Sequence, residues 1–118
     1  MSTSPNEKPI INKSVALQRL GGDEKLLATV AGFFIEDAPM LMSQLESAQA
    51  AGSMDLVTHR AHSLKGLSAT FEAIPFQAIA AEIELLGRKA DRAAIEEKLQ
   101  RLKLEFDRLL SELEAVAK

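Results

Sequence analysis

"DRAAIEEKLQRLKLEFDRLLSELEAV", residues 91–116, carries apolar residues at intervals of three and four along nearly its whole length. That spacing places them on one face of an α-helix. They are Ile95, Leu99, Leu102, Phe106, Leu109, Leu113 and Val116. Asp91 opens the stretch with a side chain that can accept hydrogen bonds from the free amides of a first helical turn. We therefore expect a long amphipathic helix after Asp91, whose apolar face must be covered by other helices.

The composition of the whole chain supports a helical protein. Of its 118 residues, 47% are hydrophobic but only 4% are aromatic, and tryptophan and tyrosine are absent. Abundant leucine and alanine favour packed helices over β-sheet. The length is sufficient for one domain with its own core. The sequence therefore predicts an all-α fold.

Charge and cysteine content exclude several classes of function. The 14 basic residues are spread among 17 acidic ones, which gives a net charge of −3 and no basic face for nucleic acid. The absence of cysteine excludes a disulfide scaffold, a thiolate metal site and a thiol nucleophile. The sequence shows no secretory signal and no stretch that approaches the roughly 18 apolar residues of a membrane span. We therefore expect a cytoplasmic protein without a membrane segment.

Glycine, proline and capping residues divide the rest of the chain into segments with short connections. Residues 1–11 are polar, contain two prolines and show no periodicity, so we interpret them as a loose leader. A first predicted helix covers 13–20 and stops at Gly21, and a second covers 24–51, between Asp23 and Gly52. A third covers 54–71 and is capped by Ser53. A fourth covers 75–87, starts with Pro75 and closes at Gly87. Residues 12–118 are expected to form an antiparallel four-helix bundle with a short additional N-terminal helix.

Spacing assigns two faces to the predicted 24–51 helix. The expected inward stripe is Leu26, Val30, Phe33, Leu41, Gln44 and Ala48. On the opposite side, Ile35 and Met42 form an apolar patch with Ala31 and Ala38, which we interpret as a binding surface for a partner protein. Pro39 should kink or split this helix near Asp37, because proline removes one backbone hydrogen bond and crowds the preceding turn.

The stretch HRAHSLKGLSATFEA, residues 59–73, holds the two histidines of the chain one helical turn apart. The core face of its helix is expected to comprise Val57, Ala61, Leu64, Ser68 and Phe71. His62 lies roughly 140° from that direction on a helical wheel, together with His59. His62 is therefore expected to be accessible to solvent in the middle of the helix.

The residues after His62 favour an open imidazole beside a positive charge. Glycine in a helix interior costs about 1 kcal/mol of stability relative to alanine, so its presence at Gly66 suggests that open space is needed there. The small side chain of Ala69 leaves space at the next turn as well. Lys65 can bring an ammonium group to anything negative attached to His62. A neutral imidazole is a competent nucleophile near pH 7, and a phosphoryl adduct would lie within reach of Lys65.

The stretch AHSLKG, residues 61–66, resembles the signature of histidine-containing phosphotransfer (HPt) domains of two-component phosphorelays. Three further stretches resemble recurrent segments of that family in the right order: LQRLGGDEKLL (17–27), FIEDAPMLMSQLESA (34–48) and AEIELLGRKAD (81–91). The sequence departs from the pattern where many members carry small polar residues or a glycine, at Leu67, Thr70 and Glu72.

This resemblance implies a helical bundle that relays phosphoryl groups. His62 would accept the phosphoryl group, Lys65 would neutralise its charge and Gly66 would leave room for it. The partners would be response-regulator receiver domains and a hybrid sensor kinase, and Mg²⁺ would come from the receiver, with no cofactor bound by this chain. No nucleotide-binding motif is present, so we do not expect ATP-dependent kinase activity. A monomer is the default expectation.

Other interpretations stay open at this point. His59 and His62 could share a metal ion, although neither has the Glu-x-x-His pairing of di-iron bundles. The chain could also be a scaffold that binds a receiver without accepting phosphate. Taken alone, His62 and Lys65 could be ordinary surface residues, and Gly66 could serve close helix packing. His59 is expected to be a solvated neighbour that could modulate His62 or contact a partner.

Overall fold

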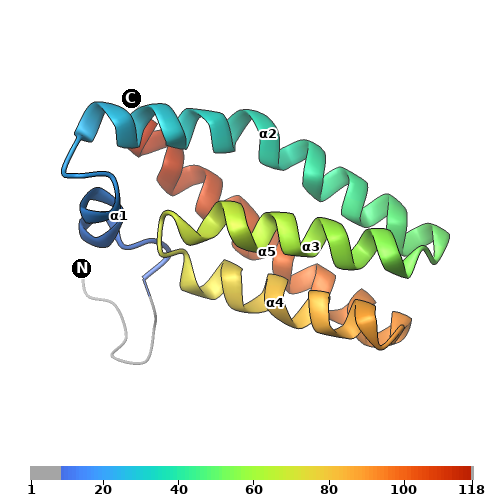
Figure 1. The fold of residues 1–118 in the computed structure, drawn as a ribbon. Coiled ribbons are helices and arrows are strands. Elements are labelled where there is room, and N and C mark those ends of the chain that lie inside the picture. Colours follow the sequence, from blue (N-terminus) through green and yellow to red (C-terminus); the bar gives the residue numbers. More distant parts are fainter. Residues whose placement is uncertain (1–8, 118) are drawn as a thin grey trace.

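Five helices make up residues 9–117, the part of the chain that the computed structural model describes (Figure 1). They are α1 (Lys13–Arg19), α2 (Glu24–Ala51), α3 (Met54–Ala69), α4 (Ile74–Arg88) and α5 (Arg92–Ala117). Each long helix packs against two others: α2 and α4 both contact α3 and α5. The predicted all-α four-helix bundle with a short additional N-terminal helix is confirmed. The predicted leader falls mainly on residues 1–8, which lie outside the described residues, and Ile10 and Ile11 pack against the core.

Helices begin and end near the predicted capping residues, but the Ser53 side chain makes no capping hydrogen bond at the start of α3. The Asp23 side chain accepts a hydrogen bond from the backbone of Leu26, and Asp91 does the same for Ala94. Gly52 ends α2 in the left-handed conformation, with φ of 72°. α3 ends two residues earlier than predicted, at Ala69.

The core follows the predicted faces of α3 and α5. Every member of the expected α5 stripe is buried except Val116, which is partly buried. Phe34 of α2 packs edge-on against Phe71, with ring centroids 5.8 Å apart, and Phe76 of α4 lies 5.8 Å from Phe106 of α5. These aromatic contacts connect α2, α4, α5 and the segment between α3 and α4 around one core.

The predicted inward face of α2 is only partly right: Ala48 is buried, and Val30 and Leu41 pack against the core. Leu26, Phe33 and Gln44 of the expected inward stripe are exposed, and Phe33 is 59% exposed. Conversely, Met42, Ala31 and Ala38 are buried, and Ile35 is half-buried and packs against the core. Apolar residues lie on most sides of α2, so periodicity alone does not identify which side packs against α3 and α5. The proposed outward patch of Ile35 and Met42 is therefore largely part of the core.

Pro39 lies inside α2, which continues through it without a break. Figure 1 shows the axis of α2 changing direction near its middle. The alternative that Pro39 splits the helix is wrong. A bend is the expected effect of a proline that removes one hydrogen bond from the helix.

α2 is also long and apolar enough, by length and composition alone, to cross a membrane. This differs from the expectation that no segment approaches such a length. The finding is weak evidence, because the core helix of a soluble protein passes the same test. In this structure α2 packs along α3 and α5, and the charged residues Glu36 and Asp37 interrupt its apolar sequence.

The sequence predicts that Gly87 closes α4. In the structure Gly87 instead lies inside that helix and is buried. The left-handed residue after α4 is Ala90, with φ of 55°. A Cβ atom at Gly87 would lie 2.3 Å from Thr58 Oγ1 and 3.2 Å from the Thr58 backbone nitrogen. Gly87 therefore allows α3 and α4 to approach each other closely.

The segment around α1 holds the C-terminal end of α3. Arg19 donates hydrogen bonds to the carbonyl of Ala69 and, at 2.7 Å, to the carboxylate of Glu72. The Asn12 amide donates to the carbonyl of Phe71 at 2.9 Å. Glu72 has a φ of 51°, the conformation that glycine adopts most easily. Arg19 holds the side chain of this left-handed residue.

Candidate functional site

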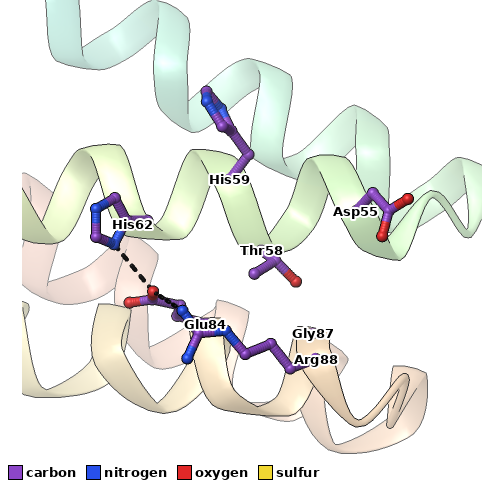
Figure 2. A pocket seen from close by; sticks show the side chains of 7 residues that line it. All are labelled: Asp55, Thr58, His59, His62, Glu84, Gly87 and Arg88. Carbon is purple, nitrogen blue, oxygen red and sulfur yellow. Dashed lines mark hydrogen bonds and ion pairs between the residues drawn. The ribbon is translucent and has the colours of Figure 1, made fainter.

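His62 projects from the middle of α3 toward solvent beside α4 (Figure 2). Its side chain is 64% exposed, so the predicted accessibility is confirmed. Its Nδ1 atom lies 2.9 Å from Oε2 of Glu84 on α4. One ring nitrogen is therefore held by the protein, and the rest of the ring is largely open to solvent.

Glu84 is the residue of this site that the sequence analysis missed. It is only 4% exposed, and three side chains reach its carboxylate. Lys65 lies 2.7 Å from Oε1, while Arg88 lies 2.7 Å from Oε2, the same oxygen that contacts His62. A signal was present in the sequence: Glu84 lies close to the apolar face of its helix, and glutamate is seldom buried without a partner.

The surroundings of Glu84 determine its charge. The hydrogen bond from Lys65 lowers the pKa of the Glu84 carboxyl most, the hydrogen bond from His62 lowers it further, and burial opposes both. The net result is a pKa below the ordinary value, so Glu84 is ionised near neutral pH. An ionised carboxylate only accepts hydrogen bonds, so Nδ1 of His62 must carry a proton. In the neutral ring, the lone pair then resides on Nε2.

Lys65 and Arg88 give this cluster an excess of positive charge. Lys65 is half-buried and Arg88 is exposed, and both pair with the single carboxylate of Glu84. With His62 neutral, two cations face one anion. The sequence predicted Lys65 as the positive neighbour of His62, but it did not predict that Glu84 binds its ammonium group. An anion attached to Nε2 would face this local positive charge.

Gly66 leaves open space one turn after His62. Among the described residues, a Cβ atom added at Gly66 would meet no heavy atom within 4 Å outside its own helical surroundings. The alternative that Gly66 serves close helix packing is therefore excluded. The steric interpretation from the sequence agrees with this geometry.

The remaining predicted site residues are less directly connected with the His62 ring. His59 is exposed, and its Nδ1 lies 2.7 Å from Nη1 of Arg60. Figure 2 shows His59 pointing away from Glu84. Ala69 is half-buried, near the end of α3. Within residues 9–117, no three or more His, Cys, Asp or Glu side chains converge as a metal-binding group.

An open hollow of about 500 Å³ lies beside His62 between α3 and α4. Figure 2 shows the side chains that line it: Asp55, Thr58, His59, His62, Glu84, Gly87 and Arg88. The close approach of the two helices at Gly87 therefore places the Glu84 cluster next to an accessible imidazole.

Glu84 also makes the stability of the bundle depend on pH. Its pKa in the folded protein lies below 4.5, so its stabilising contribution is complete above that pH and is lost as the pH falls through the folded pKa. We expect Glu84→Gln to lower the free energy of unfolding by about 1–3 kcal/mol near pH 7. The difference from the wild type should shrink at acid pH. Urea unfolding across pH measures both values, and a pH-independent difference would contradict this explanation.

A four-helix bundle that presents one oriented and accessible imidazole in mid-helix agrees with the fold and site that the resemblance to HPt domains implies. The Hpt domain family model matches residues 30–115 of this chain. The chain therefore belongs to the Hpt domain family, and it has a histidine phosphotransfer role in phosphorelay signalling. Hpt domains interact with receiver domains and kinases in such phosphorelays.

Structural comparison supports the fold. The crystal structure of histidine-containing phosphotransfer protein B (HptB) from Pseudomonas aeruginosa PAO1 superimposes with a TM-score of 0.84. The match covers 92% of this chain and 95% of that chain, at 20% sequence identity. Comparison with curated protein sequences gave no significant match. At this identity, the structural match concerns the fold alone.

Proposed function

We propose that His62 accepts a phosphoryl group on Nε2 from the aspartyl phosphate of one receiver domain and passes it to the aspartate of another. The observation that carries this proposal is the orientation of the ring. Glu84 holds Nδ1 at 2.9 Å, while the side chain is 64% exposed. Within residues 9–117, the nitrogen that bears the lone pair has no hydrogen-bond partner, so it is open to a second protein.

The transfer needs positioning and charge stabilisation more than covalent chemistry from this chain. The Nε2 lone pair attacks phosphorus in line, and the bond to the receiver aspartate breaks with its electron pair left on that carboxylate. Lys65 and Arg88 offer positive charge to the phosphoryl oxygens. Gly66 leaves room for the incoming group. We place the required Mg²⁺ in the receiver, with no cofactor held by this chain.

The expected partners are response-regulator receiver domains and a hybrid sensor kinase that contains one. The protein would work as a monomeric carrier in the cytoplasm, without ATP-dependent kinase activity of its own. Two rival functions have other outcomes in the same assays. A scaffold would bind a receiver without being phosphorylated, and a metal-binding bundle would do neither.

The partner surface expected at Ile35 and Met42 needs revision, because Met42 is buried. Phe33 and Met40 on α2 are about 60% exposed, and Leu67 on α3 is 41% exposed. Met40 and Leu67 lie at similar distances along the chain from the connection between α2 and α3. We place the receiver contact over these two helices, beside His62.

Met40→Glu should therefore weaken receiver binding by about tenfold, because it places a charge in an apolar contact. Leu104→Glu is a matched control, since Leu104 is equally exposed on α5. Isothermal titration calorimetry against one receiver domain measures both affinities. Equal losses for the two variants would contradict a contact over α2 and α3.

Incubation with a radiolabelled, phosphorylated receiver tests the function. We expect the label to move to the wild-type chain, to be labile in acid and stable in base, and to map to the peptide that contains His62. Binding without transfer would favour the scaffold. Neither binding nor transfer across a broad panel of receivers would overturn the proposal.

Lys65→Ala should slow phosphoryl transfer by roughly tenfold to a hundredfold, because one of the two cations near the transferred group is lost. Lys98→Ala is the matched control: Lys98 has nearly the same exposure and pairs with Glu82 at 2.8 Å, away from His62. Rapid-quench kinetics with one receiver compares the variants. Equal rates for Lys65→Ala and the wild type would refute the role of Lys65.

A further inference from the structure

We propose that the negative charge of Glu84 keeps Nδ1 of His62 protonated after Nε2 has been phosphorylated, and so keeps the N–P bond ready to break. Glu84 would then act as a positioning residue that sets how long the phosphoryl group stays on this protein. This inference rests on the proposed phosphorylation of His62. It goes beyond that function because it assigns the lifetime of the phosphorylated state to one buried side chain.

The geometry fixes Glu84 against the ring. Lys65 holds Oε1 from the helix that carries His62, and Arg88 holds Oε2 from the next turn of α4. On the α5 side, Lys98 pairs with Glu82 instead. The described charged groups that reach the Glu84 carboxylate are therefore Lys65, Arg88 and His62. Because Glu84 is only 4% exposed, its charge is less screened by water than that of a surface carboxylate.

The balance of the reaction shows why the Nδ1 proton matters. When neutral imidazole attacks through Nε2, the product ring holds both the Nδ1 proton and the phosphoryl group, so it is a cation. When a receiver aspartate attacks phosphorus, the N–P bond breaks and its electron pair returns to Nε2. The leaving group is then neutral imidazole, and no proton enters or leaves. If Nδ1 loses its proton first, the leaving group is an imidazolate anion, which departs far more slowly.

Charge, rather than hydrogen bonding alone, distinguishes Glu84 from a neutral residue of the same shape. The amide oxygen of a glutamine could accept the same hydrogen bond from Nδ1. It would not supply the negative charge that favours a cationic ring at 2.9 Å. An opposite charge at such a distance moves a titration by about 1–3 pH units. The phosphorylated ring of the wild type should therefore stay protonated to a higher pH than that of Glu84→Gln.

Nitrogen NMR of the phosphorylated ring provides the direct test. Protein labelled with ¹⁵N at histidine is phosphorylated chemically with phosphoramidate, so that no receiver is needed. The Nδ1 shift is then followed against pH in the wild type and in Glu84→Gln. We expect the titration midpoint of the variant to be lower by about 1 pH unit or more. Equal midpoints would overturn the inference.

A matched control separates the charge of Glu84 from general damage to the cluster. Lys65→Gln removes a cation but leaves the carboxylate in place, so its midpoint should not fall. A fall equal to that of Glu84→Gln would contradict the inference. If Glu84→Gln does not fold, the phosphorylated wild type in urea serves as the reference without Glu84. Its midpoint must then lie below that of the folded protein, and a midpoint at or above the folded value would overturn the inference.

Transfer kinetics distinguish this inference from the proposed function. Above the wild-type midpoint, which is the higher of the two, Glu84→Gln should pass its phosphoryl group to a receiver about tenfold more slowly for each pH unit by which the midpoint has fallen. Unchanged pH profiles would refute the inference and leave the carrier function standing. Failure of the phosphorylated wild type to transfer to any receiver would instead refute the carrier function, whatever the NMR titration shows.

Discussion

Replacement of His62 by glutamine is expected to abolish phosphoryl acceptance while the bundle stays folded. The acceptor nitrogen is lost, and a glutamine amide is not a nucleophile toward an aspartyl phosphate. The His62 side chain is 64% exposed, and the ion pairs of Glu84 with Lys65 and Arg88 do not involve it. We therefore expect the free energy of unfolding to change by no more than about 1 kcal/mol. Receiver transfer assays and urea unfolding measure the two effects.

His59→Gln is the matched control for this prediction, because it removes the other histidine on the same helix. The His59 ring contacts Arg60 and points away from Glu84, so it lacks the arrangement that orients His62 (Figure 2). His59→Gln should therefore still acquire an acid-labile label at His62. Continued labelling of His62→Gln, or loss of labelling only in His59→Gln, would move the acceptor away from His62.

The elements that the sequence predicted well have strong local signals. The apolar stripe of α5 repeats over nearly the whole helix and has polar residues opposite, so the sequence identifies a single face of α5 as buried. Asp23 and Asp91 mark helix starts through hydrogen bonds that span only three residues. α2 lacks such contrast, and its partners α3 and α5 decide which side is buried. For this reason Met42 was predicted on the wrong face.

The site predictions likewise succeeded where they rest on one helix and failed where they depend on contacts between two helices. The exposure of His62 and the open space at Gly66 follow from positions on one helix, and both were predictable. The Glu84 cluster depends on which residues of α4 face α3, and the position of Glu84 near the apolar face of its own helix does not identify its partners on α3. The predicted role of Gly87 failed for the same reason, because its neighbour Thr58 is 29 positions earlier in the sequence. A nearly buried glutamate on an otherwise apolar face was the available clue to this tertiary pairing.

Gly66→Leu is expected to leave the bundle at least as stable as the wild type but to reduce phosphoryl transfer by about 100-fold or more. Outside the helical surroundings of Gly66 itself, a Cβ atom there meets no heavy atom of residues 9–117 within 4 Å. Leucine also has a higher helix propensity than glycine, by roughly 0.5–1 kcal/mol. Helical side chains tilt toward the N-terminus of their helix, so a leucine here would lie over the turn that carries His62. It would fill the space through which a receiver must approach Nε2.

Gly87→Ala is the matched control. Both glycines lie inside helices, but Gly66 leaves open space beside His62, whereas Gly87 allows α3 and α4 to pack closely. Its Cβ would meet Thr58 Oγ1 at 2.3 Å and the Thr58 backbone at 3.2 Å, so this smaller substitution should lower stability by about 1–2 kcal/mol. Thr58→Ala should restore part of that loss by removing Oγ1. Urea unfolding and receiver transfer, measured on both glycine variants, should therefore give opposite patterns. A stable Gly66→Leu variant with the wild-type transfer rate would show that the space beside His62 is not used by the incoming receiver.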